Sequence, residues 1–97
     1  MERFGNDETR LIHDGDSTKA TRRVVPQALH EKAQGRIAFV LQVGSPSDCA
    51  VYSGFKMLHG TLRGTYQFQI GGPYRLRFDW DGTEAINIRV GDFHDED

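Results

Sequence analysis

The C-terminal third of the chain alternates between apolar and polar residues, and this pattern limits the possible folds more than any other feature. From residue 62 onward the apolar positions recur every second residue, which is the period of a β-strand with one buried face. Two turn signals, Gly71-Gly72 and Asp81-Gly82, divide the run into three segments, and Asp-Gly between alternating segments is typical of a hairpin. The pattern therefore predicts a meander of three antiparallel strands. Its apolar face is expected to carry Tyr66, Phe68, Ile70, Tyr74, Leu76, Phe78, Trp80, Ile86, Ile88 and Val90.

The opposite face of this predicted sheet is polar, rich in arginine and open to solvent. Guanidinium groups match the geometry of phosphate oxygens, so arginines on neighbouring strands could follow a phosphate backbone. The same pattern also describes a solvated sheet face on which Asp79 neutralises part of the charge, and the residues alone leave both readings open. The open face is expected to carry Gln67, Gln69, Arg75, Arg77, Asp79, Asn87 and Arg89.

Two helices are predicted before the sheet, with a short edge strand at residues 2–4. Asn6 or Asp7 can cap a first helix that runs to about His13. Pro26 suits the first position of a second helix that continues to about Val43. These helices must cover the apolar face of the sheet, which gives an α+β fold with two N-terminal helices packed on one face of a small, mainly antiparallel β-sheet. The buried stripe of the second helix is expected to be Leu29, Ala33, Ile37, Val40 and Leu41.

Composition predicts a single domain, residues 1–97, that is cytoplasmic. The chain has 97 residues, is 37% hydrophobic and contains one cysteine, Cys49, which excludes an internal disulfide framework and agrees with a reducing compartment. No apolar run is long enough to span a bilayer, and the first residues do not form a signal peptide. The net charge of −2 means that any nucleic-acid binding must come from local clusters of Lys and Arg. The four histidines show no metal-ligand spacing.

Two polar clusters at the rim of the predicted sheet are candidates for a catalytic site. The last strand leads into Asp92, Phe93 and His94, and histidine is the side chain whose ordinary pKa lies near physiological pH. Lys56 and His59 precede the first long strand. The two clusters form one site only if the sheet brings them together.

Strict alternation places Asp92 and His94 on the same face as the buried Ile88 and Val90. A β-bulge at Gly91 would turn both side chains to the open face, and without such a bulge the site does not assemble.

Three motifs in collinear order resemble the HigB branch of the RelE/ParE toxin superfamily, the small toxins of type II toxin–antitoxin modules. The stretch LHGTLRG at 58–64 is similar to the family pattern Leu-Lys-Gly-x-x-x-Gly. YRLRF at 74–78 is similar to Trp-Arg-Ile-x-Phe, and DFH at 92–94 is similar to Asp-Tyr-His. The resemblance covers nearly the whole chain and implies a RelE-like fold.

The resemblance implies ribosome-dependent cleavage of messenger RNA, in which a 2′-OH attacks the adjacent phosphate. Such a reaction needs a base for the 2′-OH, cationic donors for the phosphate oxygens and an acid for the departing 5′-oxygen. His94 and Asp92 match the family's C-terminal catalytic pair, and Arg75 matches a phosphate clamp. The family's His and Lys, three residues apart, are exchanged here for Lys56 and His59, so the assignment of base and acid stays open. Residues implied to bind RNA are Arg63, Arg77, Arg89, Phe93 and Gln67.

The resemblance also implies partners, and two other functions remain open. The expected partners are a cognate helix-turn-helix antitoxin (HigA-like), the ribosome with its mRNA, and operator DNA only through the antitoxin, with no membrane, metal or organic cofactor. One alternative is a non-catalytic ParE-like gyrase poison. The other is a degenerate homologue that still binds an antitoxin, which the Lys56/His59 exchange favours, whereas Asp92 and His94 favour cleavage.

Overall fold

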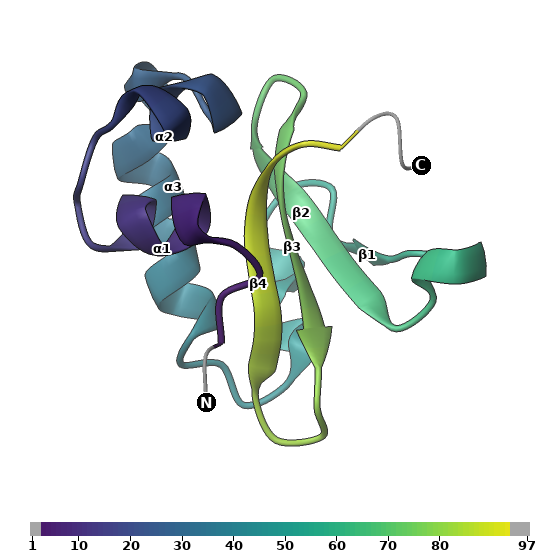
Figure 1. Cartoon of the computed structure of the whole chain (residues 1–97). Helices are drawn as coiled ribbons and strands as arrows, with labels where there is room; N and C mark the ends of the chain where they lie inside the picture. Colours follow the sequence, from purple (N-terminus) through teal and green to yellow (C-terminus); the bar gives the residue numbers. More distant parts are fainter. Residues whose placement is uncertain (1–2, 94–97) are drawn as a thin grey trace.

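Helices cover one face of a four-stranded antiparallel sheet in the computed structural model, which describes residues 3–93 (Figure 1). The α+β class predicted from the sequence is therefore confirmed. The strands lie in the order β1-β2-β3-β4, so each one pairs with its neighbour in the sequence. The elements are α1 (Asp7–His13), α2 (Lys19–Val24), α3 (His30–Val40), the 3-10 helices η1 (Gln27–Leu29), η2 (Pro46–Val51) and η3 (Gly60–Leu62), and the strands β1 (Lys56–Met57), β2 (Thr65–Gly71), β3 (Tyr74–Trp80) and β4 (Ala85–Asp92).

Helix α1 begins where its cap was predicted. The Asn6 side chain accepts a hydrogen bond from the Thr9 backbone N–H at 2.9 Å, which satisfies one of the free donors at the helix start. Helix α2 was not predicted. Its N-cap is Thr18, whose side chain and backbone exchange hydrogen bonds with Thr21 in a capping box.

The single helix predicted from Pro26 to about Val43 is wrong at both ends. Pro26 precedes the short η1, and the α-helical part starts only at His30, because Leu29 adopts ψ 0° and breaks the regular turn. Helix α3 ends at Val40. Within it Ala33, Ile37 and Val40 are fully buried, as the stripe predicted. No helix among residues 3–93 is long and apolar enough to cross a membrane.

The predicted meander corresponds to β2, β3 and β4, and two further segments extend it. Strand β1 pairs with the outer side of β2 through Lys56 opposite Gln67 and Met57 opposite Tyr66. At the other edge, Phe4 forms a parallel bridge to Ile88. The edge strand expected at residues 2–4 is thus reduced to a bridge at Phe4, and residue 2 lies outside the described residues.

The one β-bulge of the described β3–β4 ladder lies at Asn87, four residues before Gly91. Arg77 pairs with Arg89 but Asp79 pairs with Ile86, so β4 carries one extra residue there. Asn87 lies at this bulge and has φ 51°, a left-handed conformation that asparagine tolerates better than most residues. The bulge moves Ile86 to the side of Asp79, so the prediction that Ile86 shares the apolar face is wrong.

At Gly91 the ladder continues without a shift: Arg75 lies opposite Gly91 and Tyr74 opposite Asp92. The bulge at Gly91 that would turn Asp92 to the open face is therefore absent from the described ladder.

Candidate functional site

A row of polar side chains crosses all four strands on the face that the helices leave open. The pairing places Lys56 opposite Gln67, Gln67 opposite Arg77, and Arg77 opposite Arg89. Three strand spacings separate the ends of this cross-strand row, a backbone distance of about 14 Å. Three of its four members are cations, so the sheet concentrates positive charge that the net charge of the chain conceals.

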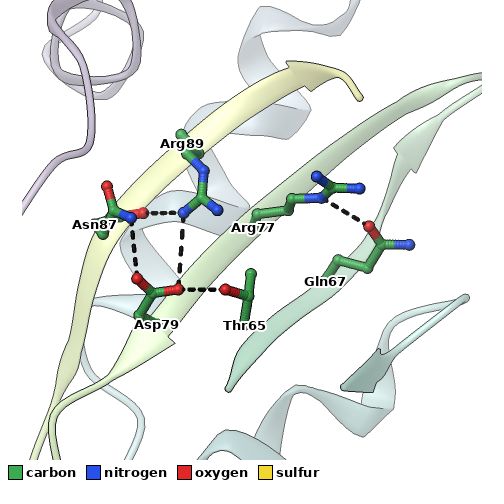
Figure 2. A network of polar contacts seen from close by, with 6 residues as sticks. All are labelled: Thr65, Gln67, Arg77, Asp79, Asn87 and Arg89. Atoms are coloured by element: carbon green, nitrogen blue, oxygen red, sulfur yellow. Dashed lines mark hydrogen bonds and ion pairs between the residues drawn. The ribbon is translucent and has the colours of Figure 1, made fainter. Parts of the chain in front are cut away.

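The centre of the row is buried. Arg77 is 0% exposed and Gln67 is 3% exposed, and the Arg77 Nε–H donates to the Gln67 Oε1 at 2.9 Å (Figure 2). The prediction that both side chains lie on a solvated face is therefore wrong, because both are almost completely removed from solvent. In this structure neither residue can touch an RNA strand directly.

One of the groups that pack on Arg77 is Phe93. The guanidinium carbon of Arg77 lies 4.5 Å from the centre of the Phe93 ring, within the range of a cation–π interaction. Phe93 is half-buried and follows directly after the last residue of β4. The sequence predicted an aromatic side chain for RNA contact here, and in the structure its ring packs on Arg77.

Arg89, at the β4 end of the cross-strand row, lies near Asp79, which is the single acid among the paired residues of the open face. The Asp79 carboxylate accepts hydrogen bonds from Thr65 Oγ1 at 2.7 Å and from Asn87 Nδ2 at 3.0 Å (Figure 2). Arg89 Nη1 lies 3.9 Å from Asp79 Oδ1 and donates to the Asn87 backbone carbonyl at 2.7 Å. Its side chain is 16% exposed. Asp79 thus neutralises part of the charge of Arg89, as one reading of the pattern predicted.

Arg75 and Asp92 are close along the sheet but leave it on opposite faces. Arg75 is half-buried on the open face, opposite Gly91. Asp92 pairs with Tyr74, on the face to which Leu76 and Val90 belong. It lines a shallow hollow at the outer edge of β4 together with Arg23, Val24, Tyr74 and Phe93. Without the bulge at Gly91, the carboxylate is not turned toward Arg75, and the predicted arrangement is wrong for Asp92.

The remaining described candidates lie on the β1 side of the sheet and beyond it. Lys56 is exposed on β1, and its place in the cross-strand row is two residue positions from the level of Arg75. His59 and Arg63 are exposed on either side of η3, beyond the point where the Leu58 N–H donates to the Thr65 carbonyl. His59 is five residue positions along the sheet from the level of Arg75, which is roughly 17 Å at about 3.3 Å per residue. His94 lies outside the described residues.

The hollow at the edge of β4 contains residues that the sequence did not single out for a site. Arg23 and Val24 come from α2, and Tyr74 comes from the start of β3. The capping residues Thr18 and Thr21 are the signal that could have revealed α2.

Cys49 is not a nucleophile in this fold. Its side chain is buried, and burial raises the pKa of the thiol to about 11, with the neighbouring Asp48 carboxylate adding to the shift. The thiol therefore stays protonated at neutral pH. Among the described residues, no three His, Cys, Asp or Glu side chains gather in a way that could hold a metal ion.

In comparisons with known proteins, no protein-family model and no curated protein matches the sequence.

Proposed function

We propose that this protein is a RelE-like toxin of a type II toxin–antitoxin module that cleaves messenger RNA on the ribosome. The observation that carries the proposal is the concentration of cations on the open face of the sheet. Lys56, Arg75, Arg77 and Arg89 share that face with one paired acid, Asp79. Phosphate neutralisation dominates the affinity of proteins for RNA, so this face is the part of the described chain best suited to an RNA strand.

The chemistry follows from the groups near the end of β4. The 2′-oxygen of the substrate attacks the adjacent phosphorus, the bond to the 5′-oxygen breaks, and the products are a 2′,3′-cyclic phosphate and a free 5′-hydroxyl. Arg75 is the proposed donor to the phosphate oxygens, whose negative charge increases in the transition state. His94 directly follows Phe93, and we propose it as the group that moves a proton. Asp92 is assigned to positioning rather than to proton abstraction because it leaves β4 on the helix side.

Lys56 and Arg89 are proposed to bind the substrate on either side of the buried Arg77. Lys56 is exposed, and Arg89 reaches solvent with part of its side chain. His59 and Arg63 lie toward the far end of the sheet and are proposed as contacts to RNA more distant from the scissile bond. Partners of the proposed toxin are the ribosome and a helix-turn-helix antitoxin, and its place of action is the cytoplasm.

Translation of a defined mRNA in vitro, with the 5′ ends of the products mapped, tests the proposal. The wild type is expected to cut at fixed positions within codons only when ribosomes are present. Arg75→Gln is expected to lower the cleavage rate about 100-fold, as for removal of one preorganised donor to an oxyanion, and His94→Ala is expected to abolish cleavage. Lys32→Gln is the matched control, because Lys32 is an exposed cation on α3, in the layer that packs on the other face of the sheet.

Three results would contradict the proposal. Intact mRNA in the wild-type reaction would exclude an active ribonuclease, and trapped gyrase–DNA complexes in a parallel assay would favour the gyrase poison. Cleavage that persists in Arg75→Gln at the wild-type rate would remove the phosphate clamp from the mechanism. Cleavage of free RNA without ribosomes would leave a ribonuclease but exclude ribosome dependence.

A further inference from the structure

We infer that the buried Gln67–Arg77 pair is a positioning device that holds Phe93, and with it the end of β4, against the open face. Arg77 has the largest side chain among the fully buried residues of the described chain. A buried guanidinium is costly unless its donors and its charge are compensated. The Gln67 Oε1 and the Phe93 ring supply two of the contacts that compensate it.

Gln67 fixes the orientation of the guanidinium. The hydrogen bond joins Arg77 Nε–H to Gln67 Oε1 at 2.9 Å, directly across the β2–β3 pair (Figure 2). Because the guanidinium is planar and rigid, fixing Nε fixes the plane on which an aromatic ring can lie. A lysine in place of Arg77 would keep the charge but would offer no such plane.

Gly91 provides the space in which Phe93 can turn back on the strand. A Cβ atom at Gly91 would lie 3.6 Å from Phe93 Cζ and 3.7 Å from Cε1, so the ring packs over the glycine backbone. Gly91 also has φ 154°, a conformation that residues with a Cβ rarely adopt. Phe93 is therefore held from two sides, by the Arg77 guanidinium and by the Gly91 backbone.

The functional consequence rests on the proposed ribonuclease activity. The proposed proton-transfer group His94 directly follows Phe93 in the sequence, so a change in what holds Phe93 is expected to affect catalysis. The sequence resemblance implied RNA contacts for Gln67, Arg77 and Phe93. The structure assigns them instead to the positioning of the catalytic end of the chain.

NMR of the full chain tests the positioning contact without any assay of activity. In the wild type the Arg77 Nε–H is expected to exchange slowly with solvent and to show a ring-current shift from Phe93. Phe93→Leu keeps apolar volume but removes the ring, and is expected to abolish the shift and to speed exchange about tenfold, as for the loss of a desolvated cation–π contact. Gln67→Leu is expected to have the same effect on exchange, whereas Gln67→Glu keeps an acceptor and is expected to preserve the wild-type signal. Gln42→Leu, an exposed substitution after α3 on the other side of the sheet, is the control.

Cleavage kinetics on saturated ribosomes test the consequence. Phe93→Leu and Gln67→Leu are expected to lower kcat with KM unchanged, because the variants disturb the catalytic end and leave Lys56 and Arg89 in place. Gln67→Glu is expected to restore kcat.

The positioning contact and its role in catalysis can be refuted separately. A wild-type Arg77 Nε–H that exchanges as fast as a surface arginine, or one unaffected by Phe93→Leu, would overturn the positioning contact. Expected NMR signals with an unchanged kcat in Phe93→Leu would overturn its role in catalysis. A wild type that shows the NMR signals but cuts no mRNA would retain the contact and reject the proposed ribonuclease.

Discussion

Lys56 is an exposed cation at the β1 end of the cross-strand row, and its replacement by glutamine should weaken the salt dependence of RNA binding by a defined amount. Three cations of the open face reach solvent, namely Lys56, Arg75 and Arg89. Arg77 is excluded from the count because it is fully buried, and Arg63 is excluded because it lies beyond the paired strands and the count covers only the open face. Three phosphate contacts are therefore expected on this face for the wild type and two for Lys56→Gln.

Counterion release converts these contacts into measurable slopes. Each contact with a single strand contributes about −0.7 to the slope of log K against log salt concentration. Wild-type affinity is then expected to fall about 18-fold between 50 and 200 mM salt, and the affinity of Lys56→Gln about sevenfold. If Arg77 also contacted phosphate, the wild-type affinity would fall about 48-fold over the same range of salt concentration.

Fluorescence anisotropy with a short 2′-O-methyl oligoribonucleotide measures these slopes, because the blocked 2′-oxygen prevents cleavage during the titration. Lys32→Gln removes the same charge from α3 and is expected to keep the wild-type slope. Equal slopes for Lys56→Gln and the wild type would exclude a phosphate contact by Lys56. A slope flattened as much by Lys32→Gln as by Lys56→Gln would exclude the open face as the place where RNA binds.

Three further predictions concern the stability and reactivity of the fold. Thr9→Val removes the hydroxyl that accepts a hydrogen bond from the buried Val90 N–H at 3.1 Å, and is expected to lower the free energy of unfolding by about 1–3 kcal/mol in urea denaturation. Asp81→Ala removes a carboxylate whose pKa is lowered mainly by hydrogen bonds from two backbone N–H groups of its turn. Because a lowered pKa contributes its full stability above the unfolded value of about 3.9, the deficit in Tm should be complete at pH 7, and it should shrink as the pH falls from that value through the lowered pKa of the folded chain. Cys49, with its thiol pKa raised to about 11 by burial, should resist a thiol reagent at pH 8 until urea unfolds the chain, as followed by absorbance.

Each of these predictions has a contrary result. A Thr9→Val chain as stable as the wild type would mean that the Val90 N–H finds another partner. A Tm deficit of Asp81→Ala that persists at pH 2 would show that the carboxylate acts through something other than its charge. Rapid labelling of Cys49 in the folded chain would show that the core opens around it.

The hairpins were predictable because their turns are encoded locally. Gly71-Gly72 and Asp81-Gly82 fix which strands pair, and alternation then fixes which side chains share a face. The pairing of Gln67 with Arg77 does not follow from these turns alone, because the register of the first hairpin shifts between Gln69 and Gly71. The start of α1 was equally local, because the cap at Asn6 lies within one turn of the helix that it begins.

The bulge in β4 was not predictable from local pattern, because the alternation runs through Ile86 without a break. A distant segment packs against it. A Cβ atom at Gly5 would lie 2.5 Å from the Asn87 Oδ1, so a larger residue at position 5 would force the Asn87 side chain to move. No pattern within the last strand carries that information.

The burial of Arg77 could not be predicted from the sequence either, because it also depends on residues outside its own strand. In an alternating strand an arginine between apolar residues predicts a solvated position. Its actual environment depends on Gln67 from the neighbouring strand and on Phe93 from the end of the chain. Which predicted site residues come together was thus decided by contacts between distant segments, whereas the residue types of the site were visible in the sequence.

The way in which β4 is covered has a consequence for association between chains. The outer edge of a sheet normally presents unpaired backbone groups, onto which a strand of another molecule can add. Here the Ile88 backbone is already bonded to Arg3 and Gly5, and the Val90 N–H is bonded to the Thr9 hydroxyl. The opposite edge is formed by β1, which is only two residues long. Edge-to-edge growth into fibrils, a common hazard for small sheets at high concentration, is therefore hindered on both sides.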